Sequence, residues 1–250
     1  MNSQQTYVTK EAGQFVSKLR YENLPSEALR IGKRCVLDGL GVILAGSCQK
    51  CTEIVRKYSQ GIGQAKEATI FGKQATKAPA ALAALANGTA GHAMDWDDTQ
   101  VSVTPDRIYG LLTHPTIPPL TACLAVSEKL GQVSGKMFLL AFLAGFEVEC
   151  KIAEAISPDH YKGGFHTSGT IGTFGAAIAA AKLMELSETQ LRHTIGLAAS
   201  MGAGIRANFG TMTKPLHVGR AAHNGVTAAM LARDGFEADT DALDGPWGFF

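Results

Sequence analysis

The chain has 250 residues, of which 46% are hydrophobic and 18% charged, and its formal net charge is +1. This balance is typical of an ordinary globular protein that can bury a sizeable core. It excludes a general electrostatic attraction to nucleic acid or to a membrane surface, so any positively charged site has to be local. The longest apolar run, 137–146, is about half of the ~20 residues that span a bilayer. We therefore expect neither a nucleic-acid partner nor a membrane partner.

Two further features concern the cellular compartment. The five cysteines are scattered and odd in number, which favours a reducing compartment over a disulfide framework. Residues 1–13 are polar and lack the apolar core of a signal peptide. The sequence therefore predicts a cytoplasmic protein, or one of the mitochondrial matrix if the source is eukaryotic.

Apolar residues at helical spacing predict helices along nearly the whole chain. In the first part, helices are expected at 10–21, 26–46, 51–60 and 78–90, with one isolated extended piece at 68–71. A loop is expected over 100–113, and further helices at 116–130, 134–156, 167–186, 187–202 and 214–233. Ser187 and Gln190 fit a capping box, and Gly235 suits a helix end. Because no second strand pattern, repeat or linker is evident, the sequence predicts a single all-α domain over 1–250, with a non-helical tail at 236–250.

The segment His92–Thr99, with the sequence HAMDWDDT, places three carboxylates and an imidazole directly after a helix of small residues. If the segment stays helical, Asp95, Asp98 and Thr99 share one face, because they are three and four residues apart. Asp97 would then point elsewhere. Polar groups beside an apolar helix cost free energy unless they are paired or used. The segment is therefore a candidate site, and a solvated helix end is the alternative.

Three basic residues, His114, His166 and Lys214, each stand immediately before a Pro or Thr where a loop enters an expected helix. Helix N-termini present free N–H groups and a partial positive charge. A cation there is unfavourable for the fold alone but suits a bound anion. A lone His or Lys in such a place is often only a loop residue, but the agreement of three predicts a pocket for several carboxylates or phosphates. His217 follows Lys214 by three residues and shares its helix face.

The acidic segment also fits other chemistry. Asp95 to Thr99 matches the DxDxT pattern of aspartate-nucleophile phosphatases, but those place the motif after an apolar strand rather than a helix. It also matches the DxDD pattern of protonating terpene cyclases, whose pockets are aromatic, whereas this chain is only 7% aromatic. Carboxylates could hold Mg²⁺, but Lys214 and the histidines would repel the ion if they converge on the same place.

Taken together, these motifs resemble the MmgE/PrpD family. The matching pieces are GHAMDWDDT at 91–99, HP at 114–115, GFHT at 164–167 and GTMTKPLH at 210–217. The resemblance implies a large all-helical domain, a smaller α/β lid domain that is absent from this chain, and a homodimer. Its site would lie between the two domains, and further His and Tyr site residues would lie beyond Phe250.

By this resemblance, five residues correspond to active-site positions of the family: Asp95, Thr99, His114, His166 and Lys214. We assign Asp95 and His114 to proton transfer, and Thr99 to orienting the substrate or Asp95. We assign His166, Lys214 and His217 to substrate binding. The loop 100–113 is expected to be longer than in the decarboxylases, which makes Arg107 and Tyr109 candidates for extra substrate contacts.

The reactions of the family make or break a C–H bond next to a carboxylate, which requires cationic anchors and an acid–base group. The sequence therefore predicts an acid–base lyase that acts on a di- or tricarboxylate. No cysteine cluster indicates an iron–sulfur centre, so we expect neither a metal nor another cofactor. Dehydration of 2-methylcitrate, in propionate catabolism, is the first expectation. Decarboxylation of cis-aconitate, epimerisation of iminodisuccinate, and a catalytically incomplete fragment that only dimerises are the alternatives.

Overall fold

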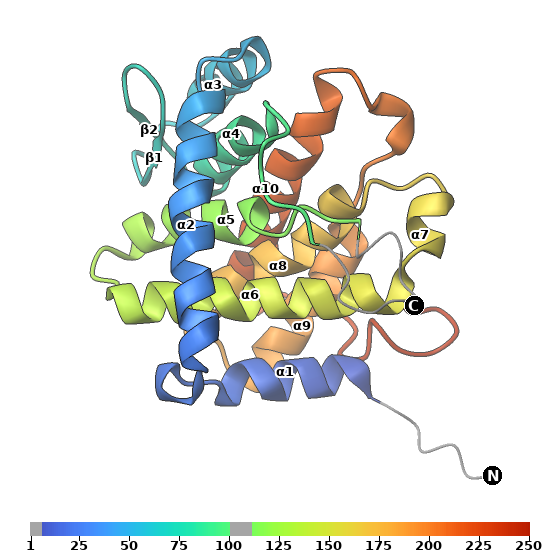
Figure 1. Ribbon diagram of the computed structural model, residues 1–250. Coiled ribbons are helices and arrows are strands. Elements are labelled where there is room, and N and C mark those ends of the chain that lie inside the picture. Colours follow the sequence, from blue (N-terminus) through green and yellow to red (C-terminus); the bar gives the residue numbers. More distant parts are fainter. Residues whose placement is uncertain (1–6, 101–111) are drawn as a thin grey trace, which may run out of the picture.

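The computed structural model describes residues 7–100 and 112–250, and these residues fold almost entirely into helices (Figure 1). The α-helices are α1 (Val8–Lys18), α2 (Ser26–Gly46), α3 (Lys50–Ile62), α4 (Ala80–His92), α5 (Ile117–Leu130), α6 (Gly135–Ile156), α7 (Asp159–Lys162), α8 (Thr167–Leu183), α9 (Glu188–Met201) and α10 (Thr213–Arg233). Two 3-10 helices, η1 (Tyr21–Asn23) and η2 (Arg206–Asn208), lie between them. The all-α prediction is confirmed, although the single turn α7 was not expected.

The core is built around α8, which is buried along its whole length. Helices α10, α6, α5 and α9 pack around it, and α10 also packs against α4. Small residues allow the backbones to approach closely. A Cβ added to Gly88 of α4 would lie 2.8 Å from the Cα of Gly219 of α10, and one added to Gly225 would lie 2.5 Å from the Cβ of Ala176 of α8. The Ala- and Gly-rich composition of these helices therefore allows tight helix–helix packing.

A small hairpin corrects one expectation. Strand β1 (Ala68–Ile70) pairs antiparallel with β2 (Thr76–Ala78), so the extended piece is not isolated. The second strand was missed because three residues are too short to show an alternating pattern. Asn87 of α4 holds the hairpin in place, since its side chain accepts a hydrogen bond from the N–H of Phe71 (3.0 Å) and donates one to the carbonyl of Thr69 (2.8 Å).

Several helix ends follow the local sequence. Ser134 caps α6 by accepting a hydrogen bond from the N–H of Met137, and Ser187 with Gln190 forms the expected capping box at α9. Gly235 follows α10 with a φ of +91°, a conformation that glycine adopts without a steric penalty. These ends fix where the loops begin, and therefore where the polar side chains described below are placed.

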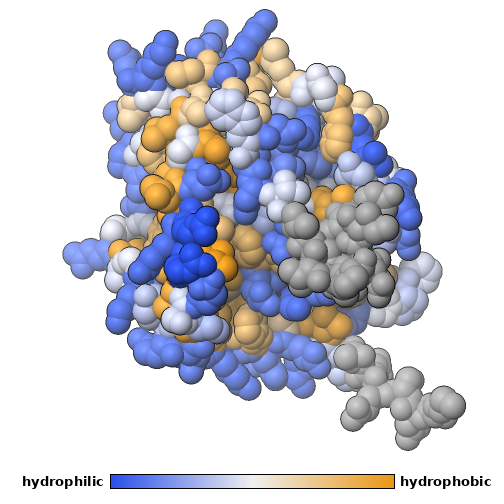
Figure 2. All heavy atoms as spheres, in the orientation of Figure 1, coloured by the Kyte–Doolittle hydropathy of each residue, from blue (hydrophilic) through white to orange (hydrophobic). Residues whose placement is uncertain are grey.

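Helix α2 crosses the outside of the bundle and exposes part of its apolar surface (Figures 1 and 2). Ile31, Leu37 and Leu44 on this helix are 44%, 74% and 55% exposed. No helix in the ranges 7–100 and 112–250 has both the length and the hydropathy that a bilayer crossing requires. The homodimer stays a prediction. The exposed apolar residues of α2 form a surface suited to contact with a second copy of the chain.

Candidate functional site

The acidic segment does not continue the helix before it, so the expectation of a shared face is wrong. Helix α4 ends at His92, and Asp95 has a φ of +57°, in the left-handed region that Asp tolerates better than most residues. The side chains of Asp95, Asp97 and Asp98 therefore point in different directions. The carboxylate of Asp98 accepts hydrogen bonds from the N–H (3.2 Å) and the hydroxyl (2.8 Å) of Thr116. Burial raises the pKa of Asp98 to about 6, although these two bonds oppose the shift.

Asp97 turns inward instead of pointing away. Its carboxylate is buried, and its two oxygens lie 2.9 and 2.8 Å from Nδ1 of His92. Because a carboxylate only accepts hydrogen bonds, the hydrogen of this contact is on Nδ1 of His92. Both residues lie in the candidate segment His92–Thr99, but neither of them was assigned a role from the sequence. The signal that could have found them is a histidine at the end of a small-residue helix, followed five residues later by an aspartate.

His114, which comes shortly before α5, lies beside His92 and Asp97. Its backbone N–H donates a hydrogen bond to the hydroxyl of Ser168 in α8 (2.9 Å). Its ring Nδ1 lies 3.3 Å from the backbone carbonyl of Asp97, and its ring meets that of His92 edge-on at 4.7 Å between centroids. Burial lowers the pKa of His114, while the charge of Asp97 acts against this shift.

Lys214 brings the start of α10 to the turn after α4. Its Nζ lies 2.5 Å from Oδ1 of Asp95 and 5.3 Å from the ring centroid of Phe209. Burial alone would raise the pKa of Asp95, but the hydrogen bond and charge of Lys214, helped by the neighbouring imidazoles, lower it below its usual value. The ammonium and the carboxylate therefore form an ion pair at the centre of the site.

Two further histidines, His166 immediately before α8 and His217 in α10, lie next to each other beside His92. Their Nδ1 atoms lie 3.1 Å apart, and the ring of His166 stacks on that of His92 at 5.6 Å. The backbone N–H of His166 donates to the carbonyl of Gly204 (3.1 Å), where a φ of +140° and the nearby His217 ring require glycine. Burial, with the positive charges of neighbouring groups, lowers the pKa of His166 to about 2. Burial therefore favours the neutral form of His166, which can bind a substrate through hydrogen bonds.

The structure thus brings most of the predicted site residues into one group. We call this group the site cluster: His92, Asp95, Asp97, His114, His166, Lys214 and His217. Asp95 and Asp97 lie in the segment after α4, and Lys214 and His217 lie at the start of α10; these two segments are green and orange in Figure 1. Thr99 is exposed, and no hydrogen bond joins it to this cluster among the described residues. Arg107 and Tyr109 lie outside the described residues, and the roles of all these residues stay predictions.

Four members of the site cluster also have the composition of a metal site. One ligand atom from each of His92, Asp95, Asp97 and His114 lies within 4.8 Å of the others. Two imidazoles and two carboxylates suit a divalent cation such as Zn²⁺. However, the ammonium of Lys214 already contacts Oδ1 of Asp95, and a cation would have to displace it. Metal independence therefore stays our prediction for the reaction.

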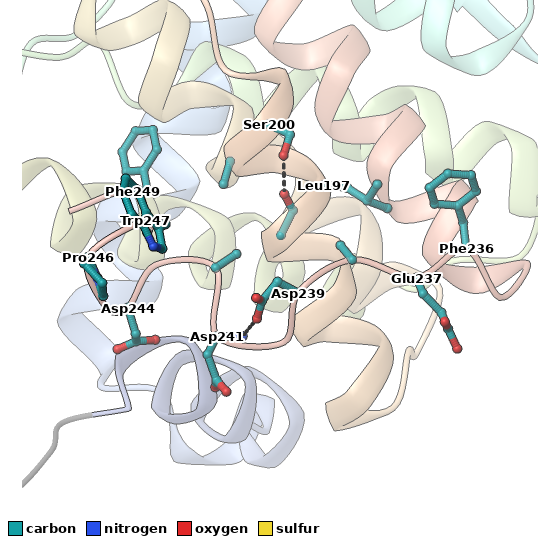
Figure 3. Close-up of a pocket in the computed structure, with 15 residues that line it drawn as sticks. Leu197, Ser200, Phe236, Glu237, Asp239, Asp241, Asp244, Pro246, Trp247 and Phe249 are labelled. Atoms are coloured by element: carbon teal, nitrogen blue, oxygen red, sulfur yellow. Dashed lines mark hydrogen bonds between the residues drawn. The ribbon is translucent and has the colours of Figure 1, made fainter.

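A cavity of about 730 Å³ lies between α9 and the C-terminal segment and shares no residue with the site cluster. Figure 3 shows acidic side chains along its rim, including Glu237, Asp239, Asp241 and Asp244. Three of them have structural partners. Asp241 pairs with Arg192 (2.7 Å), Asp244 accepts the N–H of Val8 (2.7 Å) at the start of α1, and Asp239 accepts the N–H of Asp241 (2.8 Å). The negative charge of this rim would repel a polycarboxylate, so the site cluster is the better candidate.

Comparison with known proteins agrees with the motifs on which this site is built. The family model described as MmgE/PrpD N-terminal domain matches residues 10–250. The chain belongs to the MmgE/PrpD family. Cis-aconitate decarboxylase of Homo sapiens is 32% identical over 246 residues, which are 97% of this chain and 49% of the relative. The mouse enzyme is 34% identical over 246 residues and has the same coverage, and cis-aconitate decarboxylase of Aspergillus terreus is 28% identical over 249 residues. The MmgE/PrpD chain thus spans about half the length of the curated relatives it matches.

Proposed function

We propose that this domain supplies the carboxylate anchor and the acid–base groups of a lyase that acts on a di- or tricarboxylate. One observation carries the proposal. Oδ1 of Asp95 lies 2.5 Å from the ammonium of Lys214, and Nε2 of His114 and Nε2 of His92 lie 3.8 and 3.9 Å from the same oxygen. A fixed cation and groups that can exchange a proton therefore share one small volume.

The chemistry of the proposed reaction uses both features. A substrate carboxylate that binds Lys214 takes the place of Asp95, and Asp95 then loses the partner that lowers its pKa. The freed carboxylate becomes a stronger base, close to the carbon next to the bound carboxylate. His114 provides the second proton-transfer group, and neutral His166 and His217 add hydrogen bonds to the substrate.

Decarboxylation of cis-aconitate is the first reaction to test, because the matched relatives carry that name. Loss of CO₂ leaves an electron pair on carbon, which must receive a proton from the site. Dehydration of 2-methylcitrate, the first expectation from the motifs, uses the same groups in removing a C–H proton and stays the second candidate. Both reactions need a carboxylate anchor beside an acid–base group.

The test is turnover of the natural full-length protein with cis-aconitate and with 2-methylcitrate, followed by CO₂ release and by product analysis. We expect Asp95→Asn and His114→Asn to reduce kcat by about 10²–10⁴-fold, the usual contribution of general acid–base catalysis. His223→Asn is the matched control, since His223 lies on α10 and bonds to Asn224 outside the site cluster. Wild-type activity in both site variants would remove these residues from the mechanism, and no turnover of any di- or tricarboxylate would refute the proposed function.

A further inference from the structure

Both imidazoles beside Asp95 present the same nitrogen atom to it. Nε2 of His114 and Nε2 of His92 lie 3.8 and 3.9 Å from Oδ1 of Asp95. In the described part of the chain, Nε2 of His92 is buried and has no hydrogen-bond partner. A buried polar atom without a partner costs free energy, so its presence calls for an explanation. Because this atom faces the proposed proton-transfer group, we look for the explanation in the reaction.

The other nitrogen of each ring is held by a single residue. The carboxylate oxygens of Asp97 lie 2.8 and 2.9 Å from Nδ1 of His92, and its backbone carbonyl lies 3.3 Å from Nδ1 of His114. Carboxylate and carbonyl oxygens only accept hydrogen bonds, so each Nδ1 carries the hydrogen. In a neutral ring the Nε2 atom is then a proton acceptor.

We propose that Asp97 is the positioning residue of this site, which fixes the tautomer of His92 and His114 so that both Nε2 atoms exchange protons with Asp95. His92 thereby becomes a second proton-accepting imidazole beside His114. The proposal deepens the proposed function and rests on it for the kinetic part of its test.

The proton balance of this arrangement is simple. When Asp95 takes a proton from a substrate carbon, the C–H bond breaks and an O–H bond forms on Oδ1. The electron pair stays on the substrate and is delocalised toward the neighbouring carboxylate. The Oδ1–H then passes its proton to Nε2 of His92 or His114, and the carboxylate of Asp97 stabilises the imidazolium that forms. In a dehydration the electron pair then expels hydroxide from the neighbouring carbon, and the imidazolium gives its proton to this hydroxide to form water. In a decarboxylation the C–CO₂ bond breaks and CO₂ leaves. The electron pair left on the carbon takes a proton that an imidazole has first taken up from solvent and passed on through Oδ1 of Asp95.

The first experiment measures the tautomers without any substrate. The natural full-length protein is labelled with ¹⁵N-histidine, treated with a chelator, and studied by long-range ¹H–¹⁵N correlation spectra at about pH 8–9, where ordinary histidine rings are neutral. His92→Gln and His114→Gln assign the signals. We expect hydrogen on Nδ1 and a bare Nε2 in both rings. A hydrogen on Nε2 of either ring would overturn the proposal.

The second experiment changes Asp97 to Asn. The new side chain has an NH₂ donor in place of one of the two acceptor oxygens, and we expect this NH₂ to donate to Nδ1 of His92. The hydrogen of that ring then moves to Nε2, while the ring of His114 keeps the backbone carbonyl as its partner and its tautomer is unchanged. We expect kcat per folded molecule to fall about 10²–10⁴-fold with little change in KM, because Asp97 acts through the imidazoles. A merely structural role would lower the yield of folded protein but leave the tautomer and kcat of the folded fraction unchanged, and that result would refute the proposal.

Asp98→Asn is the matched control for the spectra. It makes the same change in the same turn, but the carboxylate of Asp98 bonds to Thr116 rather than to an imidazole. We expect both tautomers to stay as in the wild type, and a reversal in this variant would show that Asp97 is not what sets them. The tautomer result is independent of turnover, so a protein with the expected tautomers but no lyase activity would refute only the proposed function.

Discussion

The turn after α4 and the interface between α6 and α8 each bury a carboxyl group, but the two groups have opposite surroundings. Asp97, in the turn, has both oxygens within hydrogen-bond distance of the His92 ring. Glu149, on α6, is fully buried, and neither of its oxygens has a hydrogen-bond partner among the described residues. Burial, with a smaller contribution from the charge of Asp98, raises the pKa of Glu149 well above its usual value.

The difference shows that burial alone does not make an acid–base group useful. Glu149 fits into a recess left by Gly175 of α8, where an added Cβ would lie 1.7 Å from its Oε2. In this recess no described residue offers Glu149 a hydrogen-bond partner with which to exchange a proton. Asp97 is equally inaccessible, but its imidazole partner connects it to Asp95 and Lys214. Three predictions test this comparison: two change one carboxyl group each, and the third fills the recess that holds Glu149.

The largest effect concerns the pH dependence of stability. The pKa of Glu149 is higher in the folded chain than the value of about 4.5 expected when the chain is unfolded, so the folded state binds this proton more tightly. Its contribution to stability is complete below about pH 4.5 and is lost as the pH rises toward the folded pKa, by up to about 1.4 kcal/mol per pH unit.

Glu149→Gln removes this titration. In urea unfolding at a series of pH values, we expect the stability of the variant relative to the wild type to increase as the pH rises above about 4.5. Glu147→Gln, an exposed position on the same helix, is the matched control and should follow the wild-type curve. Parallel curves for the wild type and Glu149→Gln would contradict a raised pKa at this position.

The second prediction concerns how much the free energy of unfolding falls when Asp97, whose carboxylate has a hydrogen-bond partner, is changed to the corresponding amide. Asp97→Asn replaces a charge-assisted hydrogen bond to His92 inside the protein, so we expect the free energy of unfolding at neutral pH to fall by about 1.5–3 kcal/mol. Asp234→Asn is the control, because Asp234 is exposed and pairs only with Arg233 in the described chain. An unfolding midpoint equal to that of the wild type would show that the contact between Asp97 and His92 contributes nothing to stability.

The smallest effect tests the recess that holds Glu149. Gly175→Ala places a methyl group where the Glu149 carboxyl lies, and we expect it to lower the free energy of unfolding by about 1–2 kcal/mol, despite the better helix propensity of alanine. Gly41→Ala, on exposed α2, has open space around the new Cβ and should instead raise stability by about 0.4–1 kcal/mol. Equal stability of the two variants in thermal or urea unfolding would mean that Glu149 moves away freely.

Much of the fold was determined by the sequence itself, because it depends on residues close together along the chain. Helical spacing located the long helices, and Ser134, Ser187 and Gly235 marked helix ends through contacts within one turn. The placement of His114, His166 and Lys214 where loops enter helices is also a local property. The family motifs could be found for the same reason, since each lies within a short stretch.

Only the tertiary structure decided what the side chains of the site do. Asp95 and Lys214 are 119 residues apart and meet because α4 and α10 pack together. The inward turn of Asp97, the exposure of Thr99 and the neutral state of His166 depend on how the chain folds back after α4 and on how deeply each group is buried. Spacing along a chain fixes the face of a helix, but the burial of a side chain and its contacts across the bundle are fixed by helices from distant parts of the sequence.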